Sequence, residues 1–93
     1  MAWAIEYGKD AEKEIAKLDR QIAQRILKFM GNRVAKLDNP RNIGEALTGS
    51  TLGEYWKYRV GDYRVIAEIQ DAKVIVQVVR VGNRRDVYRQ GTT

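Results

Sequence analysis

The sequence predicts an α+β fold of two layers, in which an N-terminal strand and a helical hairpin pack on an antiparallel β-meander. Apolar residues alternate in residues 2–7 and recur at helical spacing between residues 10 and 37. Three β-rich runs, separated by two short turn signals, fill residues 55–81. Ninety-three residues are enough for one modest core and too few for two, so we expect a single domain of residues 1–93.

The N-terminal part predicts a short half-buried strand and a first helix. In the strand, large apolar residues alternate with small or charged ones until a glycine ends the run: Trp3, Ile5, Tyr7 and then Gly8. Asp10 is a suitable N-cap because its carboxylate can accept hydrogen bonds from the first turn. The apolar spacing then carries this helix to Leu18.

A second helix is predicted from Arg20 to Leu37, where apolar residues recur every three or four positions. Gly31 inside it costs roughly 1 kcal/mol relative to alanine, which favours a kink or break nearby. Residues 41–53 form a glycine-rich connection that either serves a site or only links the helices to the sheet. A short helical turn is expected within it, from Glu45 to Leu47.

Two turns set the register of the meander, because a two-residue loop fixes which residues face each other. The loop at Gly61 and Asp62 gives these pairs: Val60 with Tyr63, Arg59 with Arg64, Tyr58 with Val65, Lys57 with Ile66 and Trp56 with Ala67. The loop at Asp71 and Ala72 gives these: Ile69 with Val74, Ala67 with Val76, Val65 with Val78 and Arg64 with Val79.

Period-two alternation sorts the side chains of the meander onto a core face and an open face. The core face collects Trp56, Tyr58, Val60, Tyr63, Val65, Ala67 and Ile69. The open face carries an apolar group that a further segment must cover, namely Ile66, Ile75, Val79 and Val81.

The open face also carries a basic group. Arg59 and Arg64 face each other, although like charges in opposite positions destabilise a strand pair. The chain is expected to leave the sheet through residues 82–85, at the same end as this pair. We therefore predict one concave basic site that contains Lys57, Arg59, Arg64, Arg84, Arg85 and Tyr88.

Composition narrows the possible chemistry. The net charge of +5 favours a polyanion or an acidic protein as partner, although a basic surface without a function is the simpler alternative. The chain has no cysteine and no histidine, which excludes thiol nucleophiles, thiolate metal sites and imidazole acid-base catalysis. Neither a signal peptide nor a membrane span is predicted, so we expect a cytoplasmic protein.

Phosphodiester cleavage suits a site rich in arginine. Its transition state places negative charge on phosphate oxygens, which preorganised guanidinium groups stabilise. RNA supplies its own nucleophile, the 2′-OH, so the protein needs only to orient it and move protons. Such a reaction requires no metal and no other cofactor.

The order of motifs in the meander resembles the RelE branch of the RelE/ParE toxin superfamily. These motifs are a tyrosine-rich strand with Lys57 and Arg59, then GDYRVI (residues 61–66), then VRVGNRRDVYR (residues 79–89). The resemblance extends over almost the whole chain and implies a RelE-like fold. It also implies a toxin of a type II toxin-antitoxin system that acts as a ribosome-dependent mRNA interferase, cutting the codon in the ribosomal A site and leaving a 2′,3′-cyclic phosphate.

Carried over position by position, the resemblance implies roles for individual residues. Lys57 matches a catalytic lysine and is the candidate base, Arg64 and Arg84 match phosphate ligands, and Tyr88 matches the C-terminal tyrosine at the cleaved nucleotide. The implied RNA contacts are Arg59, Tyr55, Arg85 and Asn83. Two positions depart from the pattern: some members have a second lysine at Tyr55, and many have a histidine at Asn83.

The resemblance also implies partners and leaves rivals open. The partners are mRNA in the A site, the ribosome with its 16S rRNA, and a RelB-like antitoxin through which alone the toxin reaches operator DNA; no membrane is involved. One rival is a ParE-like DNA gyrase poison. The other is a catalytically weakened relative or basic RNA-binding module, which would need aromatic residues on the open face, where the alternation offers only Tyr55.

Overall fold

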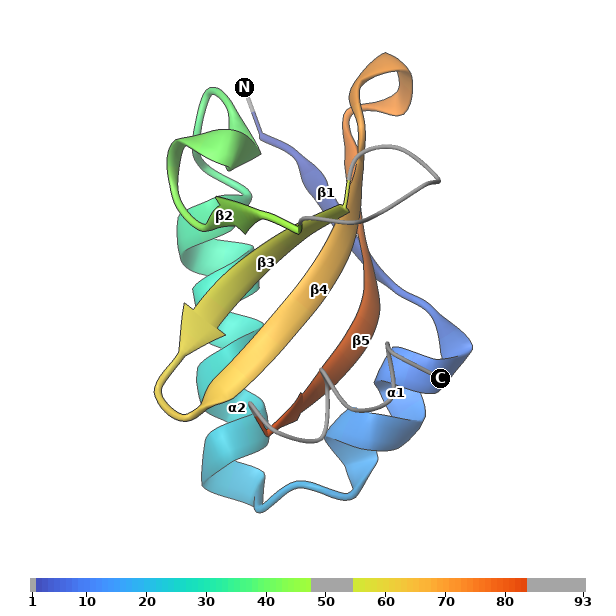
Figure 1. The fold of residues 1–93 in the computed structure, drawn as a ribbon, viewed down its shortest axis with the longest axis vertical. Coiled ribbons are helices and arrows are strands. Elements are labelled where there is room, and N and C mark those ends of the chain that lie inside the picture. The colour runs from blue at the N-terminus through green and yellow to red at the C-terminus, as the bar shows by residue number, and fades with distance from the viewer. Residues whose placement is uncertain (1, 48–54, 84–93) are drawn as a thin grey trace.

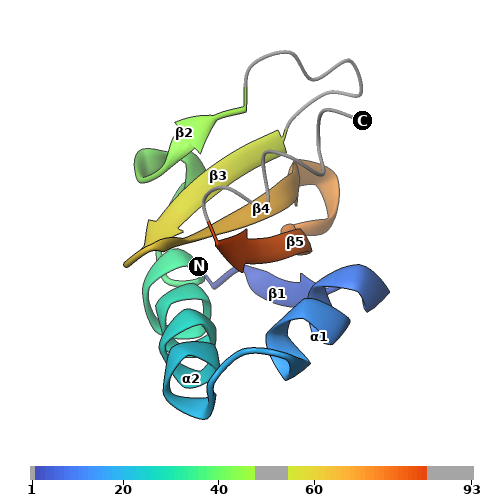
Figure 2. The same ribbon diagram turned by 60° about the horizontal axis from the view of Figure 1, so that its bottom comes forward.

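Within residues 2–47 and 55–83, the part of the chain that the computed structural model describes, five strands form one mixed sheet. They are β1 (Ala4–Tyr7), β2 (Glu45–Ala46), β3 (Tyr55–Val60), β4 (Tyr63–Gln70) and β5 (Ile75–Asn83). Their spatial order is β1-β5-β4-β3-β2, with β1 parallel to β5 and the other pairs antiparallel. The two helices lie on the same side of this sheet (Figures 1 and 2), which confirms the predicted two-layer α+β fold.

The first helix, α1 (Lys9–Ala16), begins one residue before the predicted cap. Gly8 occupies the N-cap position without a side-chain hydrogen bond, so the expectation that Asp10 caps the helix is wrong. Asp10 lies instead in the first turn, where a carboxylate interacts favourably with the helix dipole. No helix among the described residues is long and apolar enough to cross a bilayer.

The second helix changes its winding near the glycine that the sequence singles out. It runs as α2 (Arg20–Lys28), capped by the Asp19 carboxylate, which accepts a hydrogen bond from the Gln21 amide at 3.1 Å. It then continues as a π-helix over Phe29–Val34, which contains Gly31. The regular helix expected from Arg20 to Leu37 is therefore replaced by two windings, and the predicted irregularity near Gly31 is confirmed.

The core lies between the helices and the sheet. The predicted core face of β3 and β4 is confirmed: Tyr58, Val65 and Ala67 are fully buried, while Trp56 and Tyr63 are partly buried against the core. The helices and β5 supply further fully buried side chains, namely Ala11, Ile26, Met30, Val34, Val76 and Val78. This packing positions β3 and β4, and these strands carry all three of the predicted basic site residues that the structure describes, Lys57, Arg59 and Arg64.

The register of β3 against β4 is the predicted one at every pair, including Arg59 opposite Arg64. The register of β4 against β5 is wrong by two residues, because Ile69 pairs with Val76 instead of Val74. The connection is longer than two residues: a 3-10 turn over Asp71–Lys73 is followed by Val74 in a left-handed conformation, at φ 56°.

A β-bulge in β5 shifts the register of β4 against β5 a second time from the predicted one. Ile66 pairs with Arg80 while Ala67 pairs with Val78, which leaves Val79 as the extra residue. Side chains after the bulge change face, so Val81 is 1% exposed in the core and does not lie on the open face as expected. Of the other residues predicted on the open face, Ile66 is 8% exposed and both Ile75 and Val79 are half-buried.

The end of β5 and the connection before β3 also differ from expectation. Arg64 faces Gly82 instead of Val79. The chain was expected to leave the sheet through residues 82–85, but it stays in the sheet up to Asn83. In the connection, the short helical turn expected from Glu45 to Leu47 is wrong, because β2 pairs with β3 at this point. Gly44, at φ 84°, makes this approach possible, since a Cβ there would lie 2.6 Å from the Lys57 carbonyl oxygen.

Candidate functional site

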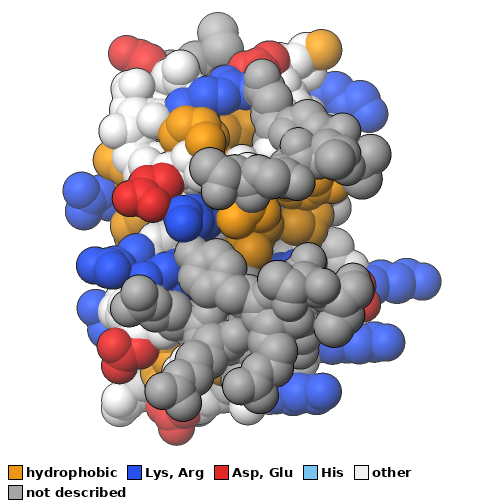
Figure 3. Space-filling model, in the orientation of Figure 1, with side chains coloured by type: hydrophobic (Ala, Val, Ile, Leu, Met, Phe, Trp, Pro, Cys, Tyr) orange, Lys and Arg blue, Asp and Glu red, His pale blue; other side chains and the backbone are white. Residues whose placement is uncertain are grey.

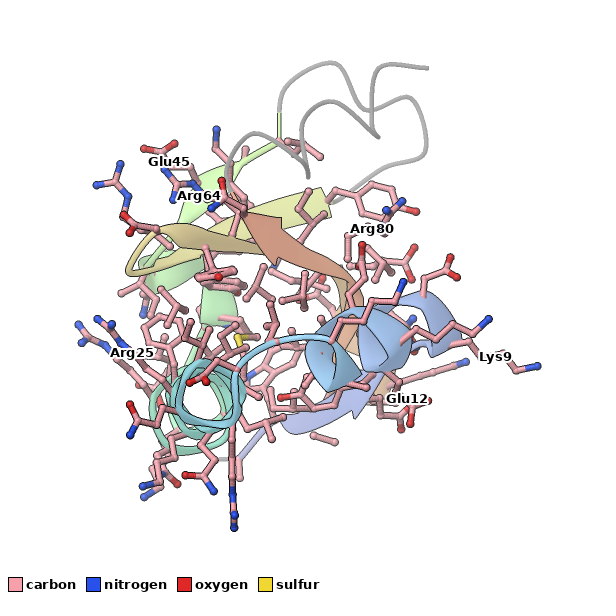
Figure 4. The ribbon with its side chains drawn as sticks, turned by 90° about the horizontal axis from the view of Figure 1, so that it is seen from below. Lys9, Glu12, Arg25, Glu45, Arg64 and Arg80 are labelled. Carbon is pink, nitrogen blue, oxygen red and sulfur yellow. The ribbon has the colours of Figure 1, made fainter. Side chains whose placement is uncertain are left out.

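A cavity of about 560 Å³ lies among residues of the π-helix, β2 and the two residues before it, β3 and β4. Five charged side chains line it, namely Arg33, Glu45, Lys57, Arg59 and Arg64. Lys and Arg side chains gather with an acidic group along the β2 and β3 side of the surface (Figure 3). Seen from below, Glu45 and Arg64 lie at the same corner of the molecule (Figure 4).

The strand wall of the cavity holds three of the predicted site residues. Lys57 and Arg59 are two residues apart on β3, and Arg64 lies opposite Arg59 on β4, so alternation and register place all three side chains on one face. Two further predicted residues, Tyr55 and Asn83, lie at other positions of the sheet, opposite Glu68 and Tyr63 respectively, and do not line this cavity. The remaining three, Arg84, Arg85 and Tyr88, lie outside the described residues.

Arg64 is an unusual residue for its position, because it is charged and only 7% exposed. One guanidinium nitrogen donates a hydrogen bond to the Tyr63 carbonyl at 3.3 Å, and no carboxylate among the described residues pairs with it. A buried cation is costly unless it is compensated by an opposite charge. Its environment therefore favours an anionic ligand in the cavity.

Glu45 is a site residue that the sequence analysis missed. The register of β2 places it opposite Lys57, and its carboxylate lies 3.5 Å from the Lys57 ammonium. Its side chain is 77% exposed and that of Lys57 is 25% exposed, so the pair is open to solvent on the carboxylate side. A strand of two residues leaves no alternation in the sequence, which is why this carboxylate was assigned to a helical turn.

Two aromatic residues of β3 have structural partners, one at the cavity and one beside it. Tyr58 is fully buried and donates a hydrogen bond to the Pro40 carbonyl at 2.8 Å; burial raises the pKa of its hydroxyl to about 12, against a smaller opposing effect of Arg41. The Trp56 indole donates to the Ile43 carbonyl at 2.7 Å. These bonds attach the connection before β2 to β3, so they fix where Glu45 stands.

Arg33 is the second site residue that the sequence analysis missed. It lies on the π-helix, and its guanidinium carbon is 5.9 Å from the centroid of the Phe29 ring. The Phe29 ring in turn meets the Tyr58 ring edge-on, with centroids 6.2 Å apart. Its signal in the sequence was weak, because an exposed arginine on a predicted helix is most often only solvated.

The far end of β5 is held by a carboxylate from α1. Glu14 accepts hydrogen bonds from the Val81 amide at 2.8 Å and from the Arg80 guanidinium at 3.0 Å. The pairing of β1 with β5 reaches only Val78, so beyond it Glu14 takes the place of a strand partner. In Figure 4, Arg80 lies above α1, toward the other edge of the sheet from Glu45. This contact fixes the segment that brings Gly82 opposite Arg64.

The described residues contain no group of three or more acidic side chains that could hold a metal ion. What they assemble is a cationic cavity with one buried guanidinium, one lysine paired with a carboxylate, and an aromatic floor. Such an arrangement can bind a phosphate group and exchange protons next to it.

Comparison with known proteins agrees with this picture. Residues 5–88 match the family described as ParE toxin of type II toxin-antitoxin system, parDE. The mRNA interferase toxin RelE of Escherichia coli K12 is 30% identical over 92 residues, which cover 97% of this chain and 94% of that protein. Toxin RelG of Mycobacterium tuberculosis is 26% identical over 90 residues, which cover 97% of this chain and 100% of RelG.

Solved structures share the fold. The toxin-antitoxin complex RelBE2 from Mycobacterium tuberculosis matches with a TM-score of 0.80 at 23% identity, over 90% of this chain and 93% of that chain. A mutant of Escherichia coli RelE in the free state matches with a TM-score of 0.70 at 30% identity, over 96% of this chain and 93% of that chain. The chain therefore belongs to the ParE toxin family of type II toxin-antitoxin systems, and it is a RelE-like toxin of the RelE/ParE superfamily.

Proposed function

We propose that this toxin is a metal-independent mRNA interferase, an endoribonuclease that cuts mRNA in the A site of the translating ribosome. The observation that carries the proposal is the buried Arg64, which faces Arg59 across the strand pair and lines a cavity together with Lys57. A volume of about 560 Å³ is in the range of small-ligand sites and suits a nucleotide. The name of the Escherichia coli relative, mRNA interferase toxin RelE, supports the same activity.

The proposed reaction begins with attack of the 2′-oxygen on the adjacent phosphorus. A bond forms between these atoms, the bond from phosphorus to the 5′-oxygen breaks, and the products are a 2′,3′-cyclic phosphate and a 5′-OH. Negative charge grows on the non-bridging oxygens, where the guanidinium groups of Arg64 and Arg59 stabilise it. In the same proposal, Arg84 adds a phosphate ligand and Tyr88 contacts the cleaved nucleotide.

Two protons must move during this reaction, one from the 2′-OH and one to the leaving 5′-oxygen. The Glu45 carboxylate lies 3.5 Å from the Lys57 ammonium, so a group that can accept a proton and a group that can donate one stand side by side at the cavity. We therefore assign Glu45 as the group that accepts the proton of the 2′-OH, and Lys57 as the group that protonates the 5′-oxygen. From the sequence, Lys57 was the candidate base, and its ion pair with Glu45 is the reason for changing that proposal.

The partners follow from the same site. A RelB-like antitoxin with acidic residues would cover the cationic cavity and block access to RNA, and the net charge of +5 favours such a partner. Solved relatives named as complexes of RelE with RelB support this part of the proposal. Operator DNA would be reached only through the antitoxin, while mRNA and the 16S rRNA of the ribosome are the targets of the free toxin in the cytoplasm. Tyr55, Asn83 and Arg85 are proposed as further RNA contacts.

The decisive experiment is a toeprint on a defined mRNA in a reconstituted translation system, with and without ribosomes. The parent is compared with Arg64→Ala and with Lys9→Ala, a control whose side chain lies on the opposite side of the molecule (Figure 4). We expect cuts in codon register that need the ribosome, that the control retains, and that Arg64→Ala slows by about 10²–10³-fold. Uncut mRNA and normal translation with the parent would refute the proposal.

The alternative activity is poisoning of DNA gyrase by protein binding, and the description of the matching family as ParE toxin favours it. A gyrase poison would not need a buried arginine together with an acid-base pair in one cavity. If mRNA stays intact, a DNA supercoiling assay decides between this alternative and a toxin that has lost its catalytic activity and acts by binding only.

A further inference from the structure

The cavity has a second cationic wall, formed by the π-helix, that the proposed reaction does not use. Arg33 contributes to this wall from the π-helix, whereas Lys57, Arg59 and Arg64 line the cavity from β3 and β4. Among residues 2–47 and 55–83, no carboxylate pairs with Arg33, and its side chain is exposed. A cation is therefore presented to the cavity without a counter-charge from the described protein.

The position of Arg33 along the helix accounts for this placement. The Ala35 amide donates to the Met30 carbonyl at 2.9 Å, a hydrogen bond that spans five residues and marks the π-turn. Met30 and Val34 both lie in the core at four-residue spacing, at which side chains share one face of a helix. Phe29 and Arg33, each one residue earlier, are thereby both aligned along the cavity.

Neighbouring rings restrict where the Arg33 side chain can go. Its guanidinium packs over Phe29, which packs edge-on against Tyr58, and Tyr58 is anchored by its hydrogen bond to the Pro40 carbonyl. A cation held over an aromatic ring loses less conformational entropy when it binds an anion than a freely rotating one does. The wall is thus preorganised as well as charged.

We propose that Arg33 binds the phosphate next to the one that is cut, so that the RNA strand crosses the edge of β3 with consecutive phosphates at Arg64 and at Arg33. This inference rests on the proposed function and deepens it, because it assigns a substrate path. Glu45, the only carboxylate among the described residues that line the cavity, is engaged by Lys57 at 3.5 Å on the strand wall. The helix wall stays favourable for an anion.

The test measures binding of the toxin to ribosomes programmed with an mRNA that has a 2′-deoxy sugar at the cut site, which prevents cleavage. Three such mRNAs are compared, and the first keeps all its phosphates. The second and the third each carry a neutral methylphosphonate in place of one phosphate next to the cut, on one side of the cut in the second and on the other side in the third. The variants are Arg33→Gln, Arg33→Lys and the control Arg25→Gln, which removes a charge from α2 without touching the cavity lining.

We expect Arg33→Gln to weaken binding to the normal mRNA about tenfold, as for loss of a hydrogen bond between charged groups. On one of the two methylphosphonate mRNAs the same substitution should change the dissociation constant by less than about twofold, since the partner charge is already gone. Arg33→Lys should keep most of the affinity, and the slope of log affinity against log salt should fall by about 0.7 only for Arg33→Gln. The control should behave as the parent.

Two outcomes would overturn this inference, and they differ from each other. In the first outcome the parent cuts unmodified mRNA, but Arg33→Gln either binds as tightly as the parent or loses the same affinity on all three mRNAs. Arg33 then does not contact a flanking phosphate, and the proposed function stands. If the parent fails to cut unmodified mRNA on ribosomes, the proposed function fails and the substrate path fails with it. Thermal melts of Arg33→Gln accompany each measurement, so that loss of fold is not mistaken for loss of contact.

Discussion

The two hairpins of the meander turn in different ways, and only the more regular one carries the candidate site. The hairpin of β3 and β4 turns in two residues, with Gly61 at φ 60°, and keeps a regular register that brings Arg59 and Arg64 together. The hairpin of β4 and β5 turns through Val74 at φ 56° and contains a bulge at Val79. The regular hairpin carries the cationic site, while the irregular one is held by contacts from other elements.

The largest effect is expected at the regular hairpin, through Glu45. Glu45→Gln keeps the size of the side chain but removes the proton acceptor beside Lys57, so the single-turnover rate of mRNA cleavage on ribosomes should fall by about 10²–10⁴-fold. Binding of uncleavable mRNA should change little. The matched control is Glu12→Gln on α1, which lies on the other side of the molecule (Figure 4) and should cleave as the parent does. A gain in rate for Glu45→Gln would show that Glu45 only restrains Lys57.

At the irregular hairpin, loss of a supporting contact should lower the free energy of unfolding. Glu14→Ala leaves the Val81 amide and the half-buried Arg80 guanidinium without their acceptor, and should lower the free energy of unfolding by about 2 kcal/mol. Glu14→Gln keeps an acceptor for the Val81 amide and should lose less. Urea denaturation of both variants measures the difference, with Glu12→Ala as the control on the same helix. Equal losses for Ala and Gln would mean that the amide hydrogen bond contributes nothing.

Smaller still is the expected gain from relieving the backbone of the second turn. A β-branched residue is unfavourable at positive φ, whereas asparagine tolerates it. Val74→Asn should therefore raise the free energy of unfolding by about 0.5 kcal/mol, less whatever packing the half-buried valine provides. The control is Ala72→Asn in the same loop, where the backbone does not have a positive φ. A loss larger than that of the control would show that packing outweighs strain at Val74.

The contrast between the hairpins also explains what the sequence could predict. Glycine followed by aspartate between two alternating runs indicates a two-residue loop, and so the pairing of Arg59 with Arg64 was predictable. Nothing in a valine indicates a left-handed backbone, and a bulge leaves the alternation intact on either side of it. For that reason the register of β5 was wrong and Val81 was assigned to the open face.

The candidate site divides in the same way. The strand residues Lys57, Arg59 and Arg64 follow from period-two alternation, which local sequence encodes. Glu45 reaches the cavity through the pairing of β2 with β3, and Arg33 through the packing of its helix against β3, neither of which has a local pattern. Residues of this second kind need a structure before they can be assigned to a site.

The smallest expected effect concerns the ion pair between Arg41 and Asp71, which links the turn between β4 and β5 to the connection before β2. The Arg41 guanidinium donates hydrogen bonds to the Asp71 carboxylate at 2.8 and 3.1 Å, and these bonds hold the pKa of Asp71 below its ordinary value of 3.8. Since the folded pKa is the lower one, the pair contributes stability above the unfolded pKa and loses it as the pH falls through the folded pKa.

Asp71→Asn should therefore melt slightly below the parent at neutral pH, and the two melting temperatures should converge as the pH is lowered past the normal titration range of an aspartate. The effect is small because the carboxylate is exposed and water screens the pair. Thermal melts from pH 7 downward in steps measure it, and added salt should reduce it further. A difference that persists at low pH would mean that the contact of Arg41 holds the second turn through its shape and hydrogen bonds instead of through charge.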